Sequence, residues 1–199
     1  YINPYMELTE NVKPVNTFEV PVTIPVKIKG SVLEDVTINI TGTNRDNFSA
    51  TKTTITLDEL ADDKTVTLNV SFTADASGTY SATIAFSNGS ELVYLSVPLL
   101  VEYNKPYIEL VGTVEPANTF EVPFTIPIEI KGLIIEDVAI ELSGDNTDNF
   151  SLSKTSITPD ELEEGNVSFN ALFTAEQSGT YEAVVNIGSF KNIPLKVTY

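Results

Sequence analysis

The sequence contains no cysteine, no histidine and no tryptophan, and it has a single methionine in 199 residues. The absence of cysteine excludes disulfide bonds and thiolate nucleophiles, and the absence of histidine excludes Ser-His-Asp catalysis and ordinary zinc sites. Because most side chains that carry enzyme chemistry are missing, we expect a protein that is not an enzyme and that holds no cofactor and no metal.

Basic residues are also scarce, since 11 Lys and Arg stand against 28 Asp and Glu, giving a formal net charge of −17. Such a chain repels the phosphates of nucleic acids and of anionic membranes. No apolar run approaches the ~18 residues of a transmembrane helix. We therefore expect no nucleic-acid partner and no direct membrane insertion by this segment. The chain begins at Tyr1 rather than Met and shows no signal peptide, so we interpret it as a mature or trimmed segment.

The chain consists of one unit that occurs twice, because the same sequence blocks recur in the same order. The pairs are PYMEL at 4–8 with PYIEL at 106–110, NTFEVPVTIPVKIKG at 16–30 with NTFEVPFTIPIEIKG at 118–132, DNFSATKTTITLDEL at 46–60 with DNFSLSKTSITPDEL at 148–162, SGTYSATI from 77 with SGTYEAVV from 178, and VPLLVEY at 97–103 with IPLKVTY at 193–199. We predict two domains, residues 1–103 and 104–199. Their connector, Asn104-Lys105-Pro106, is too short for a free tether, so we expect a semi-rigid tandem.

Apolar residues occupy every second position from Phe18 to Ile28, which predicts a half-buried strand. Pro21 and Pro25 remove two donors on one side of it, so that side is an open edge, a bulge or a crossing between sheets. Further strand patterns cover 5–8, 36–40, 53–56, 66–72, 80–86 and 93–101, with turn signals such as Asn88-Gly89 between them. Residues 56–60 and 158–162 resemble single capped helical turns. About seven strands per repeat predict an all-β fold of two tandem Ig-like antiparallel sandwiches.

The segment from Asp75 to Ala82 looks like the immunoglobulin D-x-G-x-Y-x-C signature, with Ala82 where the second cysteine would stand. Tyr80 and its repeat Tyr181 would then be structural tyrosine corners, whose hydroxyls bond upstream backbone.

A closer resemblance covers about two thirds of each repeat. The order GTN, DNFS, K-T-x-I-T, V-x-L-N-V-S-F-T-A and S-G-T-Y-x-A resembles the ASH-like, or choice-of-anchor D type, Ig-like repeats of secreted and surface proteins of Bacteroidetes. The resemblance implies an extracellular, cell-surface or periplasmic module for structure or adhesion, whose partner is a protein or glycan at the cell surface. It implies fold-determining but no catalytic roles for Gly42, Phe48, Ile55, Phe72, Gly78 and Tyr80.

Two groups of oxygen-bearing side chains have alternative interpretations. The loop Asp145–Asn149 crowds ligands suited to calcium, but a solvated turn is the better interpretation, because the first repeat has Arg45 in the matching loop.

Four pairs of adjacent acidic residues could serve as the acid and base of a glycosidase. Adjacent carboxylates on exposed turns lack the burial that separates two pKa values, so we interpret them as solvated. These pairs are Asp58-Glu59, Asp62-Asp63, Asp160-Glu161 and Glu163-Glu164.

The last strand of the first repeat offers a candidate contact surface. Alternation places Val93, Leu95, Val97, Leu99 and Val101 inward, which leaves Leu92, Tyr94 and Leu100 on the outer face. The second repeat has Lys196 where the first has Leu100, so the apolar residue indicates contact with the other domain or with a partner. A carbohydrate-binding accessory module that uses Tyr94 or loop residues is the alternative function.

Overall fold

The repeat produces two β-sandwiches of matching topology. The computed structural model describes residues 3–88 and 92–199, and contacts divide it into unit 1, Tyr1–Lys105, and unit 2, Pro106–Tyr199. The strands of unit 1 are β1 Tyr5–Leu8, β2 Val15–Thr17, β3 Val22–Ser31, β4 Val36–Thr41, β5 Phe48–Ala50, β6 Thr54–Ile55, β7 Val66–Phe72, β8 Gly78–Ser87 and β9 Val93–Tyr103. Those of unit 2 are β10 Tyr107–Leu110, β11 Ala117–Asn118, β12 Phe124–Leu133, β13 Val138–Ser143, β14 Phe150–Leu152, β15 Ser156–Ile157, β16 Val167–Phe173, β17 Thr180–Ile187 and β18 Lys191–Thr198.

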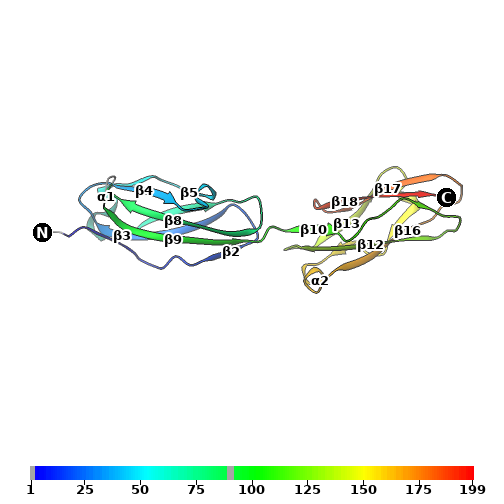
Figure 1. The fold of residues 1–199 in the computed structure, drawn as a ribbon, viewed down its shortest axis with the longest axis horizontal. Helices are drawn as coiled ribbons and strands as arrows, with labels where there is room; N and C mark the ends of the chain where they lie inside the picture. The colour runs from blue at the N-terminus through cyan, green and yellow to red at the C-terminus, as the bar shows by residue number, and fades with distance from the viewer. Residues whose placement is uncertain (1–2, 89–91) are drawn as a thin grey trace. The chain divides into compact units, whose positions relative to one another are not determined.

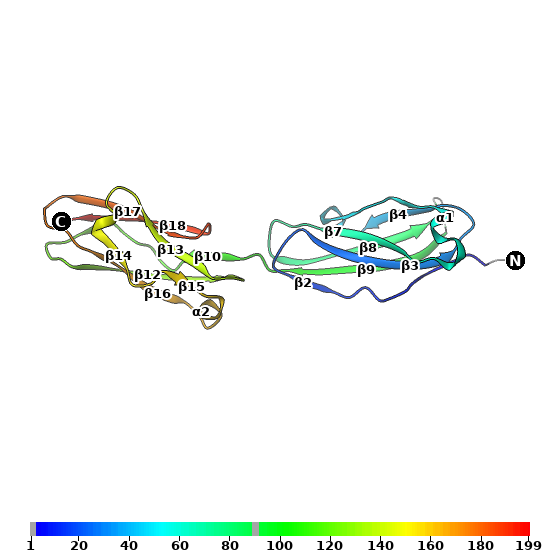
Figure 2. The ribbon, with the colours of Figure 1, turned by 180° about the vertical axis from the view of Figure 1, so that it is seen from behind.

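Each unit contains two sheets packed face to face. In unit 1 the four-stranded sheet has the order β1-β3-β7-β5 and the five-stranded sheet the order β2-β9-β8-β4-β6. Unit 2 repeats this with β10-β12-β16-β14 and β11-β18-β17-β13-β15. Figures 1 and 2 show the layers of each unit from opposite sides. This confirms the predicted Ig-like fold, with β2 and β5 and their repeats added to the strands that the pattern had indicated.

Three short helices and two single α-helical turns lie in the connections. The 3₁₀ turns are Arg45–Asn47, Ala61–Asp63 and Thr147–Asn149, and the α-helical turns are α1 Leu57–Leu60 and α2 Pro159–Glu163. Within the ranges 3–88 and 92–199, no helix is long and apolar enough to cross a membrane. The predicted turn at Asn88-Gly89 continues into residues 89–91, which lie outside the described residues, as does Tyr1.

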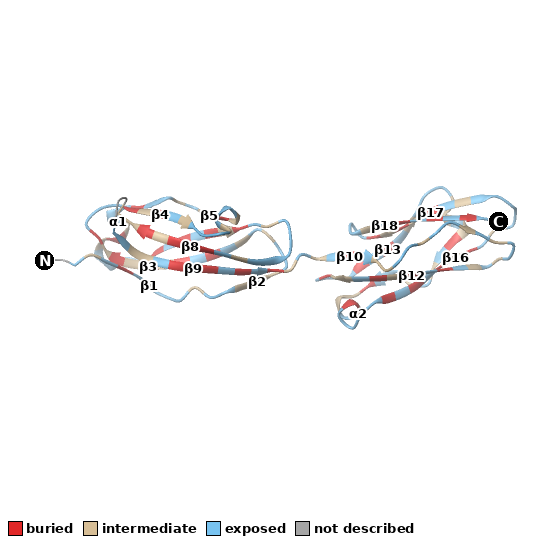
Figure 3. Cartoon of the chain, in the orientation of Figure 1, coloured by how far each residue is buried: buried red, intermediate tan, exposed pale blue. Residues whose placement is uncertain are grey.

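The alternation of side chains places the core between the sheets. Figure 3 shows buried positions alternating with intermediate ones along β8 and with exposed ones along β9. At the end of β7 in unit 1, the ring of Phe72 lies 5.1 Å from Phe48 and 5.1 Å from Tyr80, centroid to centroid. Phe173 repeats these contacts with Phe150 at 5.2 Å and with Tyr181 at 5.1 Å. Such aromatic contacts bring large apolar areas into the core and supply much of its burial energy.

Tyr80 also fixes the connection that leads into β8. Its hydroxyl donates to Ala76 O at 2.7 Å, and the Tyr181 hydroxyl donates to Gln177 O at 2.8 Å. Each hydroxyl thus reaches backbone four residues upstream, which is the geometry of a tyrosine corner. One residue therefore joins the two sheets through its ring and holds the turn between them through its hydroxyl.

The long proline-bearing strand begins later than its pattern predicts. The prediction of a strand from Phe18 is wrong, because the chain turns at the cis Val20–Pro21 bond and β3 starts at Val22. Phe18 lies in the turn and is 40% exposed, while its repeat Phe120 is 97% exposed. Period-two alternation therefore continued through a turn that belongs to no strand.

Pro25 faces an open edge of the four-stranded sheet. Strand β1 pairs with β3 only over Ile28–Ser31, and the Thr9 N–H then bonds Lys27 O at 2.9 Å. Pro25 lies two residues before Lys27 on β3, and backbone groups two residues apart point toward the same neighbouring strand. The nitrogen of Pro25 therefore points toward the β1 side, at a position beyond the end of β1. After Thr9 the chain leaves this sheet to form β2 in the other one, so no strand covers the position at which Pro25 lacks a donor.

Proline also stands at the edge of the other sheet. The Thr119 N–H donates to Thr198 O at 2.9 Å, so the carbonyl of Thr198 points toward β11. Pro194 lies four residues earlier on β18, and its nitrogen points to the same side, at a position that β11 does not reach. Pro98 occupies the matching position on β9. An edge strand without that donor is a poor template for further strands.

Gly30 generates the first prediction because β1 crosses it at very close range. A Cβ at residue 30 would lie 2.3 Å from Tyr5 O and 3.0 Å from Met6 Cα, both backbone atoms that cannot rotate away. We expect Gly30→Ala to detach β1 and to lower the free energy of unfolding of unit 1 by about 2–3 kcal/mol, measured by urea denaturation of the full chain.

Gly78→Ala is the matched control for that experiment. Its new Cβ would meet only the Tyr80 ring, at an ordinary 3.5 Å. We expect a change below about 0.5 kcal/mol, in contrast to the fold-determining role that the resemblance implies for Gly78. Equal losses in the two variants would contradict the account of Gly30.

The capping box of α2 generates a prediction on pH. The Thr158 N–H donates to Glu161 Oε2 at 2.9 Å, and Lys154 Nζ contacts Glu161 Oε1. The Lys154 hydrogen bond, followed by that of Thr158, holds the pKa of Glu161 below its ordinary 4.5. A lowered pKa means that this stabilisation is complete above pH 4.5 and disappears as pH falls through the folded-state pKa.

We therefore expect Glu161→Gln to have a lower melting temperature than the wild type at pH 7. The difference between the two melting temperatures should shrink below pH 4.5. Calorimetry across the acid range measures this. Asp160→Asn is the control, since it removes a charge from the same turn without the Lys154 contact. A difference for Glu161→Gln that stays constant at all pH values would argue against the role of the ion pair.

Candidate functional site

Strand β9 contains a bulge that changes which residues reach its outer face. Phe86 pairs with Leu95 but Ser87 pairs with Val93, so Tyr94 is the extra residue. Val93 is 52% exposed, whereas Tyr94 is half-buried and packs against the core of unit 1. The prediction that Val93 points inward and Tyr94 outward is therefore wrong, because a bulge shifts the alternation by one residue.

The predicted contact residues Leu92, Tyr94 and Leu100 do not form one patch. Leu92 and Leu100 are both exposed, at 48% and 43%. They are eight residues apart on an extended chain, about 26 Å at 3.3 Å per residue. With Tyr94 packed inward, only Leu100 keeps its predicted place in the middle of a sheet face.

The surroundings of Leu100 form an uncharged surface that we call the neutral face. Register places its residues in rows across β4, β8 and β9, and the residues between them, such as Ile84 and Val97, are buried. The rows are Thr37-Ser87-Val93, Asn39-Ala85-Ser96, Thr41-Thr83-Pro98 and Ser81-Leu100. None of these side chains is charged, and the next row along β9 brings the first carboxylate, Glu102 opposite Thr79.

Unit 2 has charges on the matching face. Ser81 and Leu100 correspond to Glu182 and Lys196, which lie directly opposite each other and form an ion pair with 2.7 Å between Lys196 Nζ and Glu182 Oε1. Asn39 corresponds to Glu141. The same scaffold therefore accepts an ion pair where unit 1 has serine and leucine.

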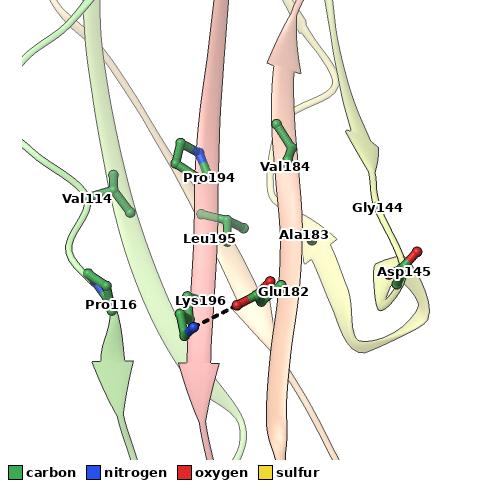
Figure 4. Close-up of a pocket in the computed structure, with 10 residues that line it drawn as sticks. All are labelled: Val114, Pro116, Gly144, Asp145, Glu182, Ala183, Val184, Pro194, Leu195 and Lys196. Carbon is green, nitrogen blue, oxygen red and sulfur yellow. Dashed lines mark ion pairs between the residues drawn. The ribbon is translucent and has the colours of Figure 1, made fainter.

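A cavity of about 410 Å³ opens beside this ion pair (Figure 4). Val114 and Pro116 form one wall, and Val184 and Pro194 lie across from them on the sheet. Figure 4 shows Asp145 at the rim beyond Glu182. An apolar hollow with charged groups at its side suits a contact with a polar side chain, but its carboxylates lack the burial that acid-base chemistry requires.

The loop Asp145–Asn149 uses its amide side chains to hold its own turn. The Glu182 N–H donates to Asn146 Oδ1 at 2.9 Å, and Asn149 Nδ2 donates to Thr174 O at 2.9 Å. Asn44 and Asn47 make the matching bonds to Ser81 and Thr73 in unit 1. Over the described part of the chain, no three acidic side chains gather as metal ligands would. The geometry is that of a hydrogen-bonded turn.

The acidic pairs occupy connections, and several of their carboxylates have structural partners. Glu59 accepts from the Thr56 N–H at 2.9 Å and contacts Lys52, and Lys52 holds the pKa of Glu59 below its ordinary value. Asp62 and Asp63 have φ angles of 57° and 60°. The Tyr5 hydroxyl donates to Asp63 Oδ1 at 3.1 Å, a hydrogen bond that raises the pKa of Tyr5.

Sequence reasoning identified Leu100 but missed the rest of the neutral face. Its members come from three strands, of which β4 lies about 40–60 residues before its partners on β8 and β9, and the register joins them in rows. The available signal was the comparison of repeats, since Ser81, Asn39 and Leu100 all match charged residues in the second repeat.

No protein-family model and no curated protein matches this sequence. Among solved structures, the D00-D0 domain of intimin has 8% identity and a TM-score of 0.42, with 99% of each chain covered. A titin I-band fragment has 15% identity and a TM-score of 0.44 over 100% of this chain and 66% of that one. A protein of unknown function from Porphyromonas gingivalis has 12% identity and a TM-score of 0.35 over 98% and 99%.

The turn at Asn146 provides the third prediction. We expect Asn146→Ala to lower the free energy of unfolding by about 1 kcal/mol, because the Glu182 N–H loses its acceptor. Millimolar calcium should leave the melting temperature unchanged. Asn146→Asp is the sharper variant, since it keeps an acceptor and adds a carboxylate beside Asp145 and Asp148. A calcium-dependent rise in the melting temperature of the wild type would restore the calcium interpretation, whereas a rise in Asn146→Asp alone would show that the added carboxylate creates a site.

Proposed function

We propose that this chain is a non-catalytic structural or adhesive module that acts by contact with a protein or glycan. We place it in an extracellular, cell-surface or periplasmic setting, which is what the resemblance to ASH-like repeats implies. The observation that carries the non-catalytic part is the use of Glu59 and Glu161 as helix caps.

The direction of the pKa shifts of these two residues supports that part of the proposal. A carboxylic acid that donates a proton near neutral pH needs a pKa raised by burial or by another carboxylate. Lys52 and Lys154 instead lower the pKa of Glu59 and Glu161, and both carboxylates also accept a backbone N–H. These residues are thus held in the charged form, which suits a cap and opposes a general acid.

The carbohydrate-binding alternative loses the platform that the sequence suggested for it. A sugar-binding ring must lie open to solvent, and Tyr94 packs against the core of unit 1. Because Tyr94 is half-buried, replacing it would disturb packing as well as any binding. A glycan contact elsewhere on the surface is tested directly below.

The test is native gel electrophoresis of the full chain in gels that contain polysaccharides, paired with an assay for released reducing ends. A protein of charge −17 migrates well, so weak binding shows as retardation. We expect uniform mobility and no release, which leaves protein contact as the function. Retardation in one polysaccharide would favour the carbohydrate-binding alternative, and release of reducing ends that Glu161→Gln abolishes would overturn the non-catalytic proposal.

A further inference from the structure

The neutral face stands out because the chain around it is strongly acidic. The protein carries 28 acidic and 11 basic side chains, yet four successive rows across β4, β8 and β9 have none. The face is also partly apolar, with Val93 52% and Leu100 43% exposed and Pro98 between them. Val93 and Leu100 lie in the first and last rows, so the feature that marks this face is its lack of charge on an acidic chain rather than a continuous apolar patch.

We infer that unit 1 binds a second copy of this chain through the neutral face, in a symmetric contact of face against face. This inference rests on the proposed contact function and names its partner. The polar residues of the face are Ser, Thr and Asn, which both donate and accept hydrogen bonds. A surface of such groups complements itself under a two-fold rotation, which a surface of carboxylates does not.

Electrostatics favours this face over other approaches between two copies. Two chains of charge −17 repel each other, and the repulsion is greatest where carboxylates would be brought together. At the neutral face the carboxylates stay at the margin, with Glu102 in the row beyond Leu100 and Glu34 bonded to Asn88 beyond Ser87. The four rows of two neutral faces can therefore meet without bringing carboxylates of the rows together.

The size of the face makes the contact weak for single molecules. From Ser81 to Ser87 the face is about 20 Å long, and three strands are about 14 Å wide, a projected area of about 300 Å². Stable complexes bury about 800 Å² on each partner. The contact therefore gains strength where many copies share one surface, because the binding of several pairs is then multivalent.

The test compares free chains with chains displayed on beads. For the free wild type, NMR spectra between about 20 μM and about 1 mM should show concentration-dependent shifts confined to β4, β8 and β9. Beads coated with the wild type should cluster. Dispersed beads together with concentration-independent spectra would overturn the inference.

The decisive variant is Ser81→Glu/Leu100→Lys, which copies the Glu182–Lys196 ion pair onto the matching positions of unit 1. Unit 2 shows that this scaffold accepts the pair, and the net charge of the chain is unchanged. We expect association to weaken at least tenfold, because the new charges must lose water on contact. Clustering equal to that of the wild type would reject the neutral face as the contact.

Thr23→Glu/Ser71→Lys is the matched control. These residues lie directly opposite each other on β3 and β7, so the same two charges enter unit 1 on its other sheet. Beads carrying this variant should cluster like the wild type, and their dispersal would reject the assignment of the face. A mixture of wild-type beads and Ser81→Glu/Leu100→Lys beads tests whether the contact is symmetric. In a symmetric contact both partners use the neutral face, so the variant beads should stay out of the wild-type clusters. Clusters that contain both kinds of bead would overturn the symmetric arrangement.

Salt provides an independent signature. Since repulsion between acidic chains opposes a contact that itself has no charges, association should strengthen between about 20 mM and about 500 mM salt. Weakening with salt would indicate binding through charged groups and would overturn the inference. The bead assay and the polysaccharide assay test different proposals. Beads that stay dispersed would reject the contact between copies but leave the non-catalytic proposal unchanged. Release of sugar from a polysaccharide would overturn the non-catalytic proposal but would not affect the bead result.

Discussion

The packing of Phe72 against Tyr80 is the contact on which each sandwich depends. Phe72 belongs to the four-stranded sheet and Tyr80 to the five-stranded sheet, so their rings join the two layers. The Tyr80 hydroxyl also secures the chain between β7 and β8, and Phe173 with Tyr181 does the same in unit 2. A fold that lacks cysteine and tryptophan thereby obtains its link between sheets from aromatic burial and one hydrogen bond.

Period-two alternation predicted the strands well where they are long and uninterrupted. The segments 36–40 and 66–72 became β4 and β7, and both helical turns lie where capping residues indicated them. Strands β2 and β5 were missed because three residues are too few to show a period. Alternation also failed at Phe18, where it continued through a turn.

The candidate site was less predictable than the fold, for two physical reasons. A bulge after Phe86 exchanged the faces of Val93 and Tyr94, and a bulge leaves no mark in a pattern of apolar residues. The neutral face depends on register, which brings Thr41 and Pro98 to the two sides of Thr83. Leu100 could be recognised only because the chain contains a second copy with Lys196 at the matching position.

The pairing of β2 with β9 has a mechanical consequence. The two strands are parallel, with Val15 beside Val101 and Thr17 beside Tyr103. Tension along the chain pulls the start of β2 and the end of β9 in opposite directions, so it loads their hydrogen bonds in shear and they must break together rather than one by one. Asn104 adds a bond from its N–H to Thr17 O and one from its amide to Asn16, just where the load enters. Stretching unit 1 along these two strands therefore acts against several hydrogen bonds at once.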